Sequence, residues 1–145
     1  MDQSSVLEIL KNKYNFNNLS IERLKIFSNL LLINNKSHNL ISKSTESNLW
    51  FRHILDSAQL LDHFNTNKKH IIVDLGAGAG FPGLILSIFD TKNKFHVKLY
   101  EKSPVKRAFL KSIINDLSLS ADIYDNVYKE TVLGDIIVCR AFKKL

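Results

Sequence analysis

The sequence predicts an α/β fold in which an N-terminal helical region precedes a parallel sheet. Three observations support this prediction. Residues 4–64 contain amphipathic helical stretches, residues 71–89 read as a buried strand, a glycine-rich turn and an apolar helix, and residues 95–139 continue the alternation of strand and helix. Strands that alternate with helices along a chain usually pair in parallel, through right-handed crossovers.

Length and composition limit the classes of protein to consider. The 145 residues suit one domain, and 45% hydrophobic residues are typical of a globular protein. No apolar run reaches the ~20 residues of a membrane span, and the N-terminus lacks a signal-peptide pattern. The single cysteine, Cys139, excludes an internal disulfide and indicates a cytoplasmic protein. The net charge of +6 indicates an acidic partner such as nucleic acid, although a base-composition bias in the coding DNA also explains abundant lysine.

Helices are predicted throughout the N-terminal region. The first covers residues 4–14, and the second begins after a cap at Ser20 and carries apolar residues at helical spacing. A third helix, or a pair of helices, covers residues 46–64 after a cap at Thr45. Turns at residues 15–18 and 34–39 separate these helices, so the region is expected to be helical without strands.

A polar stretch at residues 65–69 separates two regions. We place an N-terminal helical subdomain at residues 1–66 and an α/β unit at residues 67–145. The chain ends at Leu145, directly after its fourth predicted strand, with little sequence left to cover the far side of a sheet. The sequence thus predicts an incomplete sheet of about four strands, and we expect a C-terminally truncated version of a longer domain.

The elements of the α/β unit follow from alternation and caps. Residues 95–100 alternate apolar and polar side chains, which is typical of a strand. Ser103 can then cap a helix that has Pro104 at its first position. Residues 121–127 form a weaker predicted strand, and residues 135–139 form a strongly apolar one that we expect to be buried.

The glycine-rich turn is the most informative stretch of the sequence. Four of the five glycines, Gly76, Gly78, Gly80 and Gly83, lie there, and a helix is predicted to start at Pro82. Glycines at such a turn let backbone N–H groups approach a ligand, with a helix N-terminus behind them. Packing alone does not require four glycines, so the turn predicts a ligand.

Two ligands fit the pattern of the turn. Gly78-x-Gly80-x-x-Gly83 matches a dinucleotide fingerprint, but such a match alone is weak. Asp74-x-Gly76-x-Gly78-x-Gly80 matches the turn of S-adenosylmethionine-dependent methyltransferases, in which an acid at the end of the second strand binds the ribose. Glu101 occupies that place, which indicates a ribose-bearing ligand. The position of Asp74 before the glycines, with Gly76 rather than Gly78 closing the strand, favours S-adenosylmethionine over a dinucleotide. Structural roles remain open for both acids: Asp74 can hold the amides of the turn, and Glu101 can be a surface charge at a strand end.

Four segments occur in order along the chain: Arg52-His53-Ile54-Leu55-Asp56-Ser57, Asp74 to Gly83, Lys106-Arg107-x-Phe109-Leu110 and Cys139-Arg140-Ala141-Phe142. Together they resemble one family, the bacterial small-subunit ribosomal RNA guanine-N7 methyltransferases, also called glucose-inhibited division protein B. The resemblance covers about residues 20 to 145. It implies a Rossmann-like class I methyltransferase sheet, S-adenosyl-L-methionine as methyl donor, and methylation of N7 of a guanine in 16S ribosomal RNA. It also implies a cytoplasmic protein that acts on the small ribosomal subunit, which we expect to be a monomer.

The resemblance also implies which residues bind the cofactor. Glu101 matches the acid that ends the second strand, Val127 and Tyr128 fall near the pair that borders the adenine, and Arg140 matches an arginine of the cofactor site. Family members continue beyond the Arg140 segment with further strands, whereas this sequence ends. The full set of predicted cofactor-binding residues is Asp74, Gly76, Gly78, Phe81, Glu101, Val127, Tyr128 and Arg140.

Guanine N7 carries a free lone pair at neutral pH, so its methylation requires no prior removal of a proton. The sequence accordingly nominates no single catalytic residue and no metal ligand. Cys139 is expected to be a buried strand residue rather than a covalent catalyst. His53 either contacts substrate or forms a hydrogen bond within the helical region, and Arg52 and Asp56 are spaced to pair with each other.

The basic residues around the helix that follows Ser103 allow two interpretations. Lys102, Lys106, Arg107 and Lys111 either follow RNA phosphates or form a solvated face. Two other classes of function also remain open beside the methyltransferase. One is a non-catalytic RNA-binding module that retains the fold, and the other is a nicotinamide-dependent oxidoreductase.

Overall fold

The structure, a computed structural model, describes residues 1–125 and 133–140. Its strands are β1 (His70–Leu75), β2 (Phe95–Tyr100), β3 (Ala121–Tyr124) and β4 (Ile136–Val138). They form one sheet in the order β3-β2-β1-β4, and every pairing is parallel. The carboxyl ends of all four strands therefore lie at the same edge of the sheet. The predicted α/β class with a parallel sheet is confirmed.

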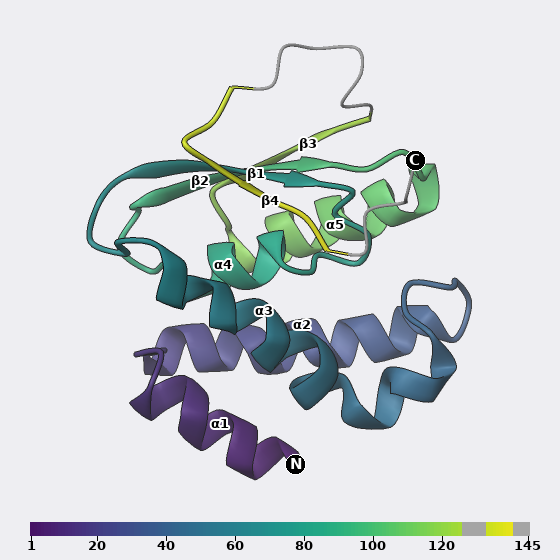
Figure 1. Ribbon diagram of the computed structural model, residues 1–145. Helices are drawn as coiled ribbons and strands as arrows, with labels where there is room; N and C mark the ends of the chain where they lie inside the picture. Colours follow the sequence, from purple (N-terminus) through teal and green to yellow (C-terminus); the bar gives the residue numbers. More distant parts are fainter. Residues whose placement is uncertain (126–132, 141–145) are drawn as a thin grey trace.

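Two helices connect the first three strands. Helix α4 (Gly83–Phe89) links β1 to β2, and helix α5 (Pro104–Leu117) links β2 to β3. Because both crossovers step in the same direction, both helices lie on one face of the sheet (Figure 1). The strand order reverses at β1, since β4 pairs with its other side. Open parallel sheets bind ligands at the carboxyl ends of strands where such a reversal occurs.

Two N-terminal helices lie beyond this layer (Figure 1). They are α1 (Gln3–Asn12) and α2 (Asn18–Asn35). The side chain of Asn17 caps α2 by accepting a hydrogen bond from Ser20 N at 2.9 Å. The predicted cap at Ser20 is wrong: the Ser20 hydroxyl is buried and donates to Asn17 O. A cap one turn earlier extends the helix and leaves Ser20 inside its first turn.

Residues 43–63 form a helical path of changing pitch rather than one regular helix. It comprises a 3₁₀ segment η1 (Lys43–Asn48), a π segment η2 (Trp50–Leu55), a short α segment α3 (Asp56–Ala58) and a second 3₁₀ segment η3 (Gln59–His63). Thr45 lies inside η1, so the predicted cap at this residue is wrong. π turns are rare and are frequently found at functional sites.

The caps in the α/β unit match the prediction better than its strand ends do. Ser103 accepts a hydrogen bond from Lys106 N at 3.3 Å, and Pro104 begins α5, as predicted. Strand β3 ends at Tyr124, so part of the predicted strand at 121–127 lies outside the described residues. Strand β4 is shorter than the predicted 135–139 and leaves Cys139 beyond its end.

The two faces of the sheet are covered differently. One continuous apolar core joins α1 and α2 to α4, α5 and the helix-side residues of the strands; Leu24 of α2, Leu86 of α4 and Leu99 of β2 are members of it. On the opposite face Ile71 is 39% and Ile137 60% exposed, because no helix of the described segments lies there. The prediction of a buried fourth strand is therefore wrong for Ile137.

The helical region and the α/β unit share this core. The boundary between residues 66 and 67 stays a prediction. None of the helices that the structure describes is both long and apolar enough to cross a membrane.

Candidate functional site

The glycine turn follows β1 at the carboxyl edge of the sheet. Gly76, Gly78 and Gly80 have φ angles of 76°, 57° and 108°, a backbone region that L side chains rarely adopt. The N–H groups of Gly76 and Ala77 both donate to Tyr100 O at 2.9 Å. These bonds place the turn over the end of β2, so the two strand ends form one site.

The glycines of the turn have different roles. A side chain at Gly83 would collide with Leu99 and with Asp74, and one at Gly80 would lie 2.6 Å from Leu84. At both positions, neighbouring side chains therefore occupy the space that a side chain would need. Gly78 differs, because a Cβ atom built on it meets nothing within 4 Å. Open space beside a left-handed glycine is where a ligand can approach the backbone closely.

Glu101 is bound to the turn rather than free at the surface. Its Oε1 accepts from Gly78 N and its Oε2 accepts from Ser103 N, both at 2.8 Å. Arg107 reinforces this connection by donating to the carbonyl oxygens of Glu101 and Lys102 at 2.9 and 2.7 Å. An ionised carboxylate has about four lone-pair sites, so Glu101 can still accept hydrogen bonds from a ligand. Arg107, in turn, has a structural role in this connection.

Asp74 supports the turn from the side of the core. It is fully buried, and its Oδ2 accepts from Gly83 N at 2.8 Å. Its Oδ1 has no hydrogen-bond partner among the described residues. Burial raises the pKa of Asp74 to about 7; the bond from Gly83 opposes this effect and the charge of Glu101 adds to it. The structural role considered for Asp74, holding an amide of the turn, is confirmed.

Phe81 links the turn to the helical region. Its ring stacks on His53 with the centroids 4.9 Å apart and meets the ring of Phe27 edge-on at 5.6 Å. The Arg140 Cζ atom lies 5.9 Å from the centroid of the same ring. Phe81 therefore lies between the turn and the segment that carries the Arg52–Ser57 motif.

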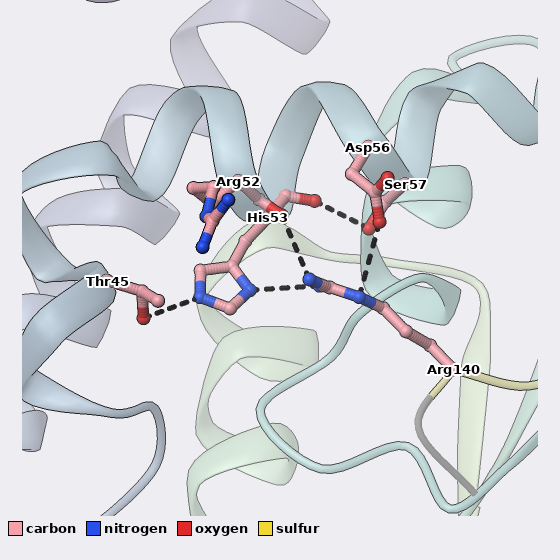
Figure 2. Close-up of polar contacts among 6 residues, drawn as sticks. All are labelled: Thr45, Arg52, His53, Asp56, Ser57 and Arg140. Atoms are coloured by element: carbon pink, nitrogen blue, oxygen red, sulfur yellow. Dashed lines mark hydrogen bonds and ion pairs between the residues drawn. The ribbon is translucent and has the colours of Figure 1, made fainter.

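Arg140 lies two residues beyond β4, and its guanidinium group points to that motif (Figure 2). Nη1 is 2.9 Å from His53 Nδ1, Nη2 donates to Arg52 O at 2.9 Å, and Nε is 3.3 Å from Asp56 Oδ2. Asp56 thus pairs with Arg140, and the expected pairing between Arg52 and Asp56 is wrong. In a regular α-helix the i,i+4 spacing brings two side chains together, but here Arg52 lies in a π segment and a partner beyond β4 binds the carboxylate.

His53 has contacts on both ring nitrogens. Nε2 is 2.9 Å from Thr45 Oγ1, and Nδ1 faces Arg140. The pKa of His53 is lowered to about 4, first by burial and then by the charge of Arg140, with a smaller effect of Arg52 and an opposing one of Asp56. The hydrogen bond expected within the helical region is therefore present, and it is joined by one to the α/β unit.

Two hollows lie in this part of the molecule, one beside His53 and Arg140 and one beside Arg107. One of about 510 Å³ is lined by segment 45–59 and Arg140, and another of about 450 Å³ lies between α5 and the end of β3. The second is close to the place expected for an adenine-bordering pair, although Val127 and Tyr128 themselves lie outside the described residues. Thr45 is a contributor that the sequence did not suggest, since its pattern indicated only a helix cap.

Cys139 departs from its expected place. It is a free, exposed thiol just beyond β4, so the prediction of a buried strand cysteine is wrong. The short β4 explains this, because the strand ends one residue earlier than the apolar run suggested.

Comparison with known proteins gives a consistent result. A family model described as rRNA small subunit methyltransferase G (GidB) matches residues 20–145. Proteins named ribosomal RNA small subunit methyltransferase G are similar to this chain: that of Rickettsia prowazekii (strain Madrid E) is 43% identical over 127 residues, 86% of this chain and 64% of its own length. The protein of Pelagibacter ubique (strain HTCC1062) is 38% identical over 95% of this chain and 70% of its own length. The protein of Orientia tsutsugamushi (strain Ikeda) is also 38% identical, over 97% of this chain and 69% of its own length. The chain thus spans about two thirds of the length of these curated relatives. With its fold, its glycine turn and these matches, the chain belongs to the rRNA small subunit methyltransferase G family.

Proposed function

We propose that this protein binds S-adenosyl-L-methionine at the glycine turn and transfers its methyl group to N7 of a guanine in 16S ribosomal RNA. The observation that carries the proposal is the bond between Glu101 at the end of β2 and Gly78 of the turn after β1. This bond places an acceptor for ribose hydroxyls next to Gly78, a glycine of the turn whose missing side chain leaves open space. The names of the relatives support the ribosomal RNA substrate.

The residues present fit this cofactor. Glu101 keeps free lone pairs for hydroxyl donors, and Gly78 leaves room for close approach. Gly76 and Phe81 would contact the cofactor within the turn, and Arg140 would lie at the same edge of the sheet, beside Phe81. Val127 and Tyr128 stay predicted contacts to the adenine. When bound, S-adenosylmethionine supplies an electrophilic methyl group on a sulfonium.

The packing of the turn argues against the dinucleotide interpretation. A dinucleotide fingerprint needs its second glycine clear for the pyrophosphate and its helix N-terminus free to bind it. Here the corresponding position, Gly80, lies against Leu84. The first amides of α4 are also occupied, because Gly83 N donates to Asp74 and Leu84 N donates to Gly80 O. These contacts favour S-adenosylmethionine over a nicotinamide cofactor.

The protein's residues in this reaction bind and orient rather than transfer protons. The N7 atom attacks with a free lone pair, so no general base is required. Both ring nitrogens of His53 are occupied, by Arg140 and Thr45, which makes it unsuited to accept a substrate proton. Holding N7 in line with the methyl group can supply several kcal/mol by proximity alone, roughly 7–11 in favourable cases. We further propose a cytoplasmic monomer that acts on the small ribosomal subunit.

Binding and transfer can be measured separately. Isothermal titration calorimetry of the purified chain is expected to show binding of S-adenosylmethionine and S-adenosylhomocysteine but not of NAD. Methyl transfer from labelled donor to small ribosomal subunits that lack the modification tests the substrate, and mass mapping of the 16S RNA tests the N7 position. Salt-dependent RNA binding without cofactor binding would instead indicate a non-catalytic RNA-binding module.

A further inference from the structure

We propose that His53 and Thr45 are positioning residues that fix the guanidinium group of Arg140 beside Phe81, so that the helical region determines the arginine side of the cofactor site. The geometry of this arrangement stands by itself, and its effect on S-adenosylmethionine binding rests on the proposed function. Neither residue is argued to contact the cofactor.

The direction of each hydrogen bond is fixed by chemistry. A guanidinium group can only donate, so Arg140 Nη1 requires an acceptor at His53 Nδ1, 2.9 Å away. A neutral imidazole that accepts at Nδ1 carries its proton on Nε2, which then donates to Thr45 Oγ1 at 2.9 Å. The Thr45 hydroxyl donates onward to Ser42 O, also at 2.9 Å. Figure 2 shows the first two of these bonds, from Arg140 through His53 to Thr45.

His53 is the best fixed of the three partners of Arg140. The side chain of Asp56 is 52% exposed, and an ion pair at that exposure contributes little. The backbone carbonyl of Arg52 also orients the guanidinium group, but any residue at position 52 would offer the same carbonyl. The imidazole of His53 is part-buried and stacked on Phe81 at an interplanar angle of 24°. Its acceptor atom is therefore held in place by the ring contact and by Thr45 together.

The arrangement leaves part of the guanidinium group for a ligand. Arginine has five N–H groups, and among the described residues the contacts to His53, Arg52 and Asp56 use three of them. The remaining two, one on each terminal nitrogen, are held in a fixed direction. A donor that is already oriented loses less conformational entropy when a ligand binds.

Protonation of His53 would break this arrangement. A proton on Nδ1 would face the N–H of Arg140, and the charged groups around the ring are Arg140, Arg52 and Asp56. Two of these three are cations, and the pKa of His53 is accordingly lowered to about 4 by burial and by Arg140. The imidazole is therefore neutral throughout the physiological range, as the acceptor role requires.

Substitutions can separate positioning from folding. His53→Leu removes the acceptor, whereas His53→Asn places an amide oxygen near the position of Nδ1. We expect S-adenosylmethionine affinity, measured by calorimetry, to fall about 5- to 10-fold in His53→Leu, the net value of one ordinary hydrogen bond, because the loss acts on the cofactor only through Arg140. His53→Asn should recover most of this loss, and Thr45→Val should weaken binding about 2- to 5-fold. His63→Leu, at the exposed end of the same helical path, is the matched control and should bind like the unsubstituted protein.

A cofactor-free measurement decides the geometry independently. Nitrogen-15 NMR of the free protein should show the Nε2–H tautomer of His53, and His53→Leu should shift the Nε–H signal of Arg140 while His63→Leu should not. An Nδ1–H tautomer, or an Arg140 signal indifferent to His53, would overturn the inference. So would S-adenosylmethionine affinity in His53→Leu equal to that of the control. If the unsubstituted chain binds no S-adenosylmethionine, the proposed function fails, and the NMR result alone decides the positioning role. If His53→Leu does not fold, the affinity of Thr45→Val and the tautomer of His53 decide the positioning role.

Discussion

The turn side and the arginine side of the site are held by different kinds of contact. On the turn side, backbone N–H groups of Gly78 and Gly83 donate to carboxylates 23 and 9 residues away. On the arginine side, side chains meet across 87 residues of sequence, and the acceptor is an imidazole whose tautomer must be correct. The turn side is also more deeply buried, since Asp74 has no exposed surface and Arg140 does. Substitutions on the turn side should therefore alter stability most, and those on the arginine side should alter ligand binding with little effect on stability.

The largest expected effect is a pH dependence of stability that arises from Asp74. Its pKa rises from 3.8 to about 7 on folding, so its contribution to stability is complete below pH 3.8 and is lost as the pH rises through 7. The corresponding loss is up to about 4 kcal/mol. The Asp74→Asn side chain cannot ionise. Between pH 5 and pH 8.5, the free energy of unfolding, measured in urea, should therefore fall more in the unsubstituted protein than in Asp74→Asn.

The comparison with the variant removes the other titrations. His53 acts in the opposite direction, since its lowered pKa means that stability is lost as the pH falls from 6.5 toward 4. This contribution is the same in both proteins and cancels in the difference. If the difference in free energy of unfolding between Asp74→Asn and the unsubstituted protein were equal at pH 5 and pH 8.5, Asp74 would keep one charge state across this range.

Alanine substitutions of two glycines distinguish packing from open space within the turn. At Gly83 a methyl group would collide with Leu99 and Asp74, and overpacking of a buried site costs about 1–3 kcal/mol. At Gly78 there is room, so Gly78→Ala should cost only the ~1 kcal/mol of a left-handed backbone. Thermal unfolding of the two variants measures the difference. Equal losses of stability would contradict the distinction between a packed and an open glycine.

The turn side was predictable because its information is local. The order of Asp74, the glycines and Glu101 is enough to place one acid near the end of β1 and one directly after β2. Both acids lie at the same edge of the sheet once β1 and β2 are known to be parallel. The capping of α5 by Ser103 was predicted for the same reason, since a cap is read from neighbouring residues. Local signals failed where two caps competed: Asn17 begins α2 although Ser20 also suits the role.

The arginine side could not be predicted in detail because its contacts are long-range. Spacing on a helix suggested that Arg52 would pair with Asp56, and nothing in that spacing indicates a competitor beyond β4. Apolarity suggested a buried strand through Cys139, but exposure depends on what covers the second face of the sheet. The motif around His53 is recognisable in the sequence, while only the fold shows that His53 meets Arg140 and Phe81.

Glu101→Gln tests whether one residue of the turn side acts on the ligand more than on the fold. The amide keeps one acceptor for Gly78 N, but it places an NH₂ group against Ser103 N and removes the charge. We expect a loss of about 1.5–3 kcal/mol in S-adenosylmethionine binding, the value of hydrogen bonds to a charged acceptor. Calorimetry and urea unfolding on the same sample separate the two effects. A larger loss of stability than of affinity would make Glu101 a structural residue of the turn.

Asp56→Asn should give the smallest effect and tests the arginine side directly. The ion pair with Arg140 is long at 3.3 Å and its Asp56 side chain is 52% exposed, so its contribution is below about 1 kcal/mol. It should also disappear in 1 M salt, which screens exposed charges beyond about 3 Å. Asparagine keeps the shape of the side chain, so the bond from Arg140 to His53 is retained, and cofactor affinity measured by calorimetry should change less than 3-fold. If Asp56→Asn weakened binding as much as His53→Leu, the charge of Asp56 rather than the imidazole would orient Arg140, and the arginine side would depend on salt in a way that the turn side does not.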